Sequence, residues 1–179
     1  MPRKLKNEEL GRKTVEEFKK APKIPLVLVL DNIRSQNNTG SVFRTADAFL
    51  AEKIILCGIT AVPPHPEIHK TALGATESVT WEYRVDTAST IQELRKEGYT
   101  IISVEQAENN IPLNQFKVDT NRKYALVFGH EIHGVRQDVV DLSDAVIAVP
   151  QYGTKHSLNV AVCAGIVVWE FFTAFTNGK

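Results

Sequence analysis

The chain has no excess charge of either sign and no apolar run long enough to cross a membrane. Among its 179 residues, 21 Lys and Arg balance 21 Asp and Glu, which argues against a strong overall attraction to nucleic acid. The longest apolar stretch lies near the C-terminus, and Glu170 interrupts it before it reaches the length of a membrane span. The first twenty residues are charged and contain no signal-peptide core. These absences predict a single-domain, soluble, cytoplasmic protein.

Cysteine is scarce, and its two residues lie in apolar surroundings. We expect Cys57 and Cys163 to be buried, reduced thiols rather than a disulfide. Cys163 belongs to the apolar C-terminal stretch, where burial keeps a thiol protonated and unreactive. This position argues against a catalytic cysteine.

Several familiar nucleotide and metal motifs are missing. Neither a GxGxxG turn nor a GxxxxGK[ST] phosphate loop is present. His130 and His133 are three residues apart, whereas the HExxH zinc helix needs a spacing of four, so we predict no metal site. Ser157 follows His156 directly, and adjacent side chains do not make a hydrolase triad.

The charge that is present is unevenly distributed. Residues 1–25 contain eight Lys and Arg against four Glu, a net charge of +4 that the remainder cancels. Residues 1–23 therefore form a basic N-terminal arm. Two interpretations stay open: a tail that contacts RNA, and a helix of mixed charge that stabilises a dimer.

Short apolar segments, rich in β-branched residues, alternate with amphipathic ones. The predicted strands are residues 24–31, 53–59, 80–85, 99–104, 124–129 and 145–150. The predicted helices are residues 39–50, 90–98, 136–143 and the C-terminal apolar stretch. Residues 60–78, rich in Pro and His, are expected to form a long irregular loop. The alternation predicts an α/β fold with a mostly parallel sheet and helices on both faces.

Unusual polar loops follow three of the predicted strands: DNIRSQNNTG (31–40), GHEIHG (129–134) and QYGTKHS (151–157). Ligands of parallel sheets bind outside the carboxyl ends of the strands, and glycines let backbone groups approach a ligand closely. We therefore expect these loops to form one site. Taken singly, each residue has a plainer explanation, such as a helix N-cap for Ser157, a surface ion pair for Arg44 and a loop charge for Glu131.

Taken together, NNTGSVFRTADAF, LVFGHEIHGV and VPQYGTKHSLNVAV resemble the three signature motifs of the SpoU (TrmH-like) RNA 2′-O-methyltransferases of the SPOUT superfamily. The resemblance covers roughly residues 24–175. It implies a catalytic domain over residues 24–179 and a deep trefoil knot at its C-terminal end. It also implies S-adenosylmethionine (SAM) as cofactor and a homodimer with the site near the interface.

The resemblance also assigns roles by motif position. The catalytic residues would be Asn38, Arg44, Glu131, Ser157 and Asn159. The cofactor would be held around Val104, Phe128, Gly129, Gly134, Val149, Gln151, Ser157 and Leu158. Because a guanidinium is always protonated, we expect Arg44 to stabilise the developing alkoxide rather than to act as a base. Glu131 and Asn38 would hold that guanidinium. The third motif departs from the family pattern at Gln151 and Ala161, which leaves the catalytic positions intact.

The RNA substrate is less defined. The segment KHSLNVA is more similar to TrmH than to the wobble-position enzymes, which favours tRNA, with rRNA as the alternative. Phosphate contacts are expected from the basic arm and from Lys70, Arg84, Lys155 and His156. Two other classes stay open: a catalytically silent RNA-binding protein of the same fold, and a methyltransferase that acts on small molecules.

Overall fold

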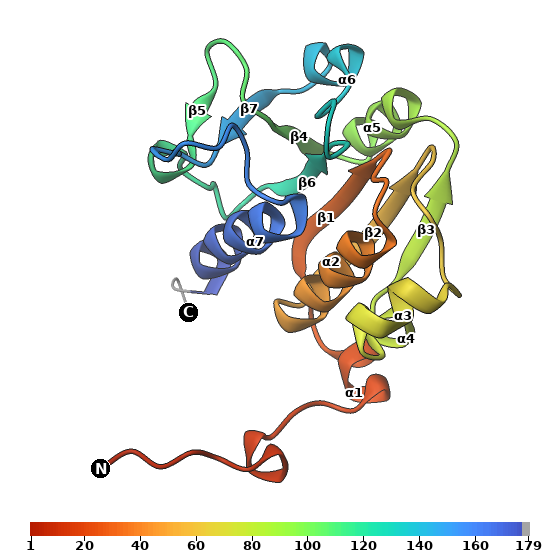
Figure 1. Ribbon diagram of the computed structural model, residues 1–179, viewed down its shortest axis with the longest axis vertical. Coiled ribbons are helices and arrows are strands. Elements are labelled where there is room, and N and C mark those ends of the chain that lie inside the picture. The colour runs from red at the N-terminus through yellow and green to blue at the C-terminus, as the bar shows by residue number, and fades with distance from the viewer. Residues whose placement is uncertain (177–179) are drawn as a thin grey trace.

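The computed structural model describes residues 1–176, which are built around one parallel sheet (Figure 1). The strands are β1 (Ile24–Asp31), β2 (Ala51–Cys57), β3 (Trp81–Arg84), β4 (Tyr99–Val104), β5 (Ile111–Pro112), β6 (Lys123–Phe128) and β7 (Ala145–Ala148). The sheet order is β3-β2-β1-β6-β4-β7-β5, and every neighbouring pair is parallel. This confirms the predicted α/β class. The predicted knot is consistent with this order and stays a prediction.

Helices cover both faces of the sheet (Figure 1). They are η1 (Asn7–Leu10), α1 (Val15–Lys20), α2 (Gln36–Ala48), α3 (Pro66–Ala72), α4 (Ala75–Ser78), α5 (Thr87–Lys96), η2 (Leu113–Gln115), α6 (Gln137–Asp141) and α7 (Val160–Thr176). Successive residues of β1 point to opposite faces. Leu28 packs with the α2 and α7 side of the core, and Val29 packs with the α5 and α6 side. No helix of residues 1–176 is both long and apolar enough to cross a membrane.

The prediction of an irregular loop over residues 60–78 was wrong in part, because two short helices lie there. Pro66 begins α3, a position where its missing N–H costs nothing, and the side chain of His65 accepts a hydrogen bond from the Glu67 N–H. Leu73 and Gly74 then adopt left-handed backbone angles, which separate α3 from α4. The strand β5, which has only two residues, was not predicted from the sequence. β2 begins two residues earlier than predicted and ends before Gly58, whose φ is 61°.

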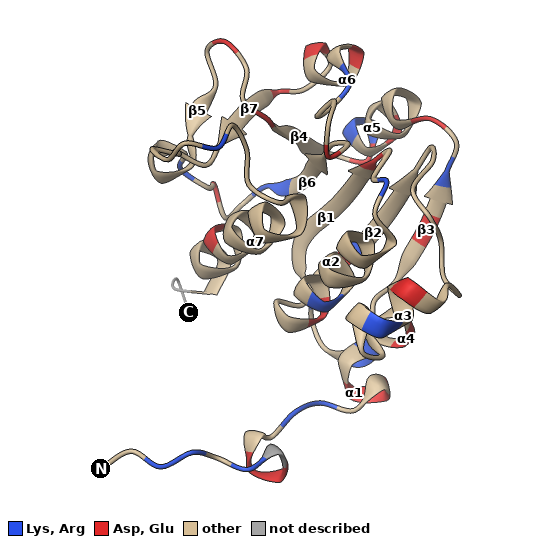
Figure 2. Ribbon diagram, viewed as in Figure 1, with Lys and Arg blue, Asp and Glu red and all other residues tan. Residues whose placement is uncertain are grey.

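The basic arm extends away from the sheet, and Lys and Arg residues are spaced along it (Figure 2). Thr14 caps α1 by accepting a hydrogen bond from the Glu17 N–H at 3.2 Å. Phe18 is the buried residue of α1 and anchors the arm to the core. The chain before α1 is exposed at residues 1–6 and 8–14.

Helices α2 and α3 pack closely because Gly40 of α2 has no side chain at the contact. A Cβ on Gly40 would lie 2.1 Å from Thr71 Oγ1 and 2.4 Å from the Ile68 carbonyl oxygen. Since the second of these atoms is backbone, α3 would have to move to admit a methyl group. We expect Gly40→Ala to lower the free energy of unfolding by about 1–3 kcal/mol, measured by urea denaturation. Ser41→Ala, at the next position of α2, is the matched control. A Gly40→Ala protein as stable as this control would contradict the packing.

Candidate functional site

A cavity of about 320 Å³ lies where β4, β6 and β7 end. Its walls come from the segments that follow these three strands, and from the start of α7. All eight residues predicted to hold the cofactor line it: Val104, Phe128, Gly129, Gly134, Val149, Gln151, Ser157 and Leu158. The structure therefore brings them together, and their role in binding stays a prediction.

The loop that begins at Gly129 is closed by two hydrogen bonds between His130 and Gly134. The His130 N–H donates to the Gly134 carbonyl at 3.0 Å, and the Gly134 N–H donates to the His130 carbonyl at 2.8 Å. A Cβ on Gly129 would lie 2.1 Å from the backbone carbonyl carbon of Gly134. Gly134 itself has a φ of 68°, a conformation that favours glycine. Both glycines are therefore needed for this loop to close beside the cavity.

The three motifs are joined by a chain of hydrogen bonds that runs from Glu131 through Asn38 to Asn159. The Glu131 carboxylate accepts bonds from the Arg34 N–H at 2.9 Å, the Ser35 N–H at 2.9 Å and Asn38 Nδ2 at 2.8 Å. Asn38 Oδ1 accepts from Asn159 Nδ2 at 3.0 Å. Three residues that were predicted to be catalytic thus connect the loops after β1, β6 and β7.

Asn159, and not Ser157, caps the last helix. Asn159 Oδ1 accepts hydrogen bonds from the Ala161 N–H at 2.9 Å and the Val162 N–H at 3.3 Å, as an N-cap side chain does. Ser157 lies before the cap, is exposed and borders the cavity. Within residues 1–176 its hydroxyl makes no hydrogen bond, so the capping interpretation of Ser157 was wrong and the hydroxyl is available to a ligand.

The ionisation of Glu131 follows from these bonds. Partial burial acts to raise the pKa of its carboxyl group. The hydrogen bonds from the Arg34 N–H, Asn38 and the Ser35 N–H outweigh that effect and hold the pKa below its ordinary value of 4.5. At neutral pH the carboxyl group is therefore an anion that accepts three hydrogen bonds from the segment after β1.

Two predicted catalytic residues, Asn38 and Arg44, do not line this cavity. Asn38 is hydrogen-bonded to Glu131 and Asn159, which do, whereas Arg44 is not. It is six residues beyond Asn38 on α2, which places the two side chains about 120° apart around the helix. Its exposed side chain lines a separate hollow with Ser41, Thr45, Lys70 and Thr71. Among the described residues Arg44 makes no hydrogen bond or ion pair with Glu131 or Asn38. The expected clamp on its guanidinium is therefore absent within one chain.

Two side chains that shape the cavity, Glu105 and Gln106, were not among the predicted site residues. They follow β4 directly, and this position after a predicted strand was the available indication. Glu105 Oε2 accepts a hydrogen bond from the Val135 N–H at 2.8 Å, and Gln106 Nε2 donates to the His156 carbonyl at 2.9 Å. Both residues line the cavity and tie a neighbouring loop to the end of β4.

The two cysteines are free, as predicted. Cys163 also lines the cavity. Burial raises the pKa of its thiol to about 11, and the negative charge of Glu105 adds to the effect. The thiol is therefore protonated at neutral pH, which agrees with the argument against a cysteine nucleophile.

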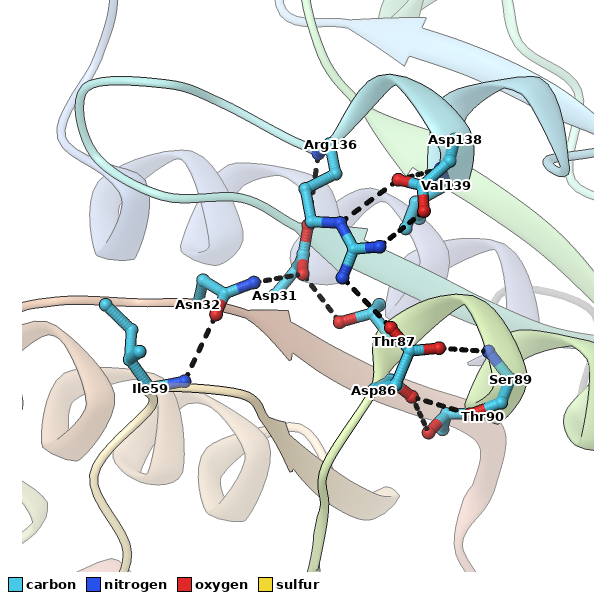
Figure 3. Close-up of polar contacts among 10 residues, drawn as sticks. All are labelled: Asp31, Asn32, Ile59, Asp86, Thr87, Ser89, Thr90, Arg136, Asp138 and Val139. Carbon is cyan, nitrogen blue, oxygen red and sulfur yellow. Dashed lines mark hydrogen bonds and ion pairs between the residues drawn. The ribbon is translucent and has the colours of Figure 1, made fainter.

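A second polar network lies at the end of β1 and fixes the far end of the Gly129 loop (Figure 3). The buried Asp31 carboxylate accepts hydrogen bonds from Thr87 Oγ1 at 2.5 Å, Asn32 Nδ2 at 2.9 Å and the Arg136 N–H at 3.1 Å. The Arg136 guanidinium pairs with Asp86 at 3.0 Å and with Asp138. Residues 129–136 are thus held at both ends, near the cavity by Glu131 and behind it by Asp31.

Comparisons with known proteins agree with this geometry. The model of a family described as the SpoU rRNA methylase family matches residues 25–169. The 23S rRNA (guanosine-2′-O-)-methyltransferase RlmB of Ralstonia nicotianae is 32% identical over 82% of this chain and 57% of its own length. The chain therefore spans less than two thirds of that relative.

Solved structures give the same fold. The TrmH/SpoU tRNA modifying enzyme of A. aeolicus superposes with a TM-score of 0.81 at 22% identity, over 92% of this chain and 82% of the other. An AdoMet-bound rRNA methyltransferase from Sinorhizobium meliloti superposes with a TM-score of 0.76 at 27% identity, over 82% of this chain and 55% of the other.

The lowered pKa of Glu131 gives a pH-dependent prediction. A carboxyl group whose pKa is depressed by folding contributes stability above its unfolded value, here 4.5, and loses it as the pH falls through the folded value. We expect Glu131→Gln to lower the free energy of unfolding by about 1–3 kcal/mol at pH 7. The difference from wild type should shrink below pH 4.5, as measured by denaturation at several pH values. Glu108→Gln, at an exposed position, is the control. A difference that stays constant down to the acid transition would contradict the assignment.

Proposed function

The chain belongs to the SpoU rRNA methylase family, and we propose that it transfers a methyl group from SAM to a ribose 2′-hydroxyl of RNA. The observation that supports this most directly is that two of the three motif loops line one cavity, while the first motif loop is hydrogen-bonded to both of them. Glu131, Asn38 and Asn159 connect these loops by hydrogen bonds, and residues of two of them line the cavity at the carboxyl ends of the strands.

The cavity fits the cofactor by size and by chemistry. Its volume of about 320 Å³ is within the range of small-molecule sites. Its lining combines apolar side chains, such as Phe128 and Leu158, with polar groups and with the backbone around Gly129 and Gly134. SAM supplies an activated methyl group when bound, so positioning by the protein provides much of the rate.

The acceptor hydroxyl is a very weak acid that must lose its proton as it attacks. Ser157 presents a hydroxyl at the cavity wall that is free to contact the acceptor. A cation near the acceptor oxygen would stabilise the negative charge that develops there. Arg44 is the residue we propose for this task, although it lies outside the cavity of its own chain.

A second copy of the chain would bring Arg44 to a cavity from outside its own chain. Val162, Ile166 and Trp169 form an exposed apolar stripe along α7, with exposed fractions of 53%, 40% and 52%. Trp169 packs against Phe49 at 5.5 Å between ring centroids, and Phe49 borders the hollow that holds Arg44. We propose a homodimer that buries this stripe, so that Arg44 of one copy completes the cavity of the other.

The RNA is proposed on two separate observations. The third motif, KHSLNVA, favours tRNA. The Ralstonia relative is a 23S rRNA methyltransferase, which favours 23S rRNA as the second candidate. In either case Lys155 and His156 are exposed on the loop beside the cavity, and Lys70 lies in the Arg44 hollow. We propose that these three residues contact phosphates. Arg84 is paired with Glu82 at 3.0 Å, a shorter ion pair than the 3.9 Å contact of Lys70 with Glu67.

Arg44→Ala tests the reaction. We expect labelled methyl transfer from SAM to unmodified tRNA or rRNA to fall at least about 100-fold. Binding of S-adenosylhomocysteine should stay within twofold, because Arg44 would act on the acceptor oxygen and not on the cofactor. Arg122→Ala, which removes an exposed Arg paired with Asp119 at 3.2 Å, is the control. Wild-type turnover in Arg44→Ala would refute its role. RNA binding without any methyl transfer by the wild type would favour a silent RNA-binding protein, and transfer to free nucleosides a small-molecule enzyme.

Ile166→Glu tests the dimer. We expect wild type to show twice the mass of one chain in light scattering after gel filtration, and Ile166→Glu to show the mass of one chain. A charge within the buried stripe would remain unpaired. Val85→Glu makes the same change at an 81% exposed apolar residue after the edge strand β3, and it should leave the mass unchanged. A monomeric wild type, or a dimeric Ile166→Glu, would contradict the proposed interface.

A further inference from the structure

The carboxylates of Glu105 and Glu131 line the cavity. They differ in the number of acceptor sites that remain free for hydrogen bonds from a ligand. Glu131 accepts three hydrogen bonds from the loop after β1. Glu105 accepts two, from the Gln106 N–H to Oε1 at 2.8 Å and from the Val135 N–H to Oε2 at 2.8 Å. A carboxylate has about four acceptor sites, so each oxygen of Glu105 retains one.

The Glu105 carboxylate is also fixed in orientation. One oxygen is held by the backbone of its own segment, and the other by the loop that follows β6. Gly134 lies directly against it, because a Cβ at that position would be 2.1 Å from Oε2. A half-buried acceptor pair is thereby held at the wall of the cavity, at the first position after β4.

We infer that Glu105 binds the ribose of the cofactor by accepting hydrogen bonds from its 2′ and 3′ hydroxyls. This inference rests on the proposed function. Two adjacent hydroxyls donate two hydrogen bonds, which matches two oxygens with one free site each. An acidic residue that binds a ribose hydroxyl is also the solution used in dinucleotide-binding α/β folds, where the ligand likewise lies at the carboxyl ends of the strands.

The same carboxylate has a second possible use, which is attraction to the positive sulfonium of SAM. The two uses predict different ligand selectivity. A ribose contact affects SAM and S-adenosylhomocysteine equally, because both carry the same ribose. A contact with the sulfonium affects SAM alone, because S-adenosylhomocysteine lacks that charge. The orientation of Glu105 by two backbone donors favours the directional hydrogen bonds of the ribose.

The experiment compares the affinities of two proteins for S-adenosylhomocysteine, its 3′-deoxy analogue and SAM by titration calorimetry. Wild type and Glu105→Gln are each titrated with S-adenosylhomocysteine and with its 3′-deoxy analogue. We expect Glu105→Gln to weaken S-adenosylhomocysteine about 10- to 100-fold. The 3′-deoxy analogue should lose less, because one of the two hydroxyls that Glu105 would bind is already missing. SAM should lose as much as S-adenosylhomocysteine. Glu108→Gln, which changes an exposed carboxylate nearby, should change none of these affinities.

If Glu105→Gln weakened S-adenosylhomocysteine and its 3′-deoxy analogue equally, the loop would be generally distorted and the inference would be overturned. A loss of affinity confined to SAM would also overturn it. Wild type alone provides a second measurement if Glu105→Gln does not fold. Equal affinity of wild type for the ribose and 3′-deoxy ligands would overturn the inference as well. Absence of any binding to wild type would instead refute the proposed cofactor, which separates the two failures.

Discussion

The site depends on one carboxylate, that of Glu131, and on the donors it collects from another loop. The backbone N–H groups of Arg34 and Ser35 and the amide of Asn38 all point at it. Asn38 passes the connection on to Asn159, which caps α7. Loops that are far apart in the sequence are thereby held at one end of the sheet. Because hydrogen bonds to an ionised group are stronger than those between neutral groups, this anion is a suitable centre for such a network.

This arrangement changes the meaning of the motif residues. Glu131, Asn38 and Asn159 interact mainly with one another and with backbone, so their first effect is to shape the cavity wall. Ser157 and Arg44 are different, since neither has a partner among the described residues that explains its presence. Residues that hold a site and residues that act on a ligand are therefore mixed within the same motifs, and the geometry separates them.

Much of the fold follows from the sequence, because strands buried on both faces are apolar throughout. β1 and β4 were predicted with their observed bounds for this reason. The cavity lining also followed, from polar loops placed after parallel strands together with the resemblance of motifs. Two features could not be predicted from the sequence, the N-cap of α7 and the strand β5. Asn159, and not Ser157, caps α7, and its amide nitrogen is held by Asn38, which is distant in the sequence. The edge strand β5 is too short to leave a pattern.

Because Arg44 lies outside the cavity of its own chain, activity would depend on the assembly of the proposed dimer. Described residues of a single chain line the cavity, and the hydrogen bonds that connect the motifs lie within that chain. Arg44 lies on another face of α2, beside the apolar stripe of α7. Under the proposed dimer, cofactor binding is a property of the monomer, whereas catalysis is a property of the assembled pair. Dilution below the dissociation constant of the dimer would then remove turnover while leaving the cofactor bound.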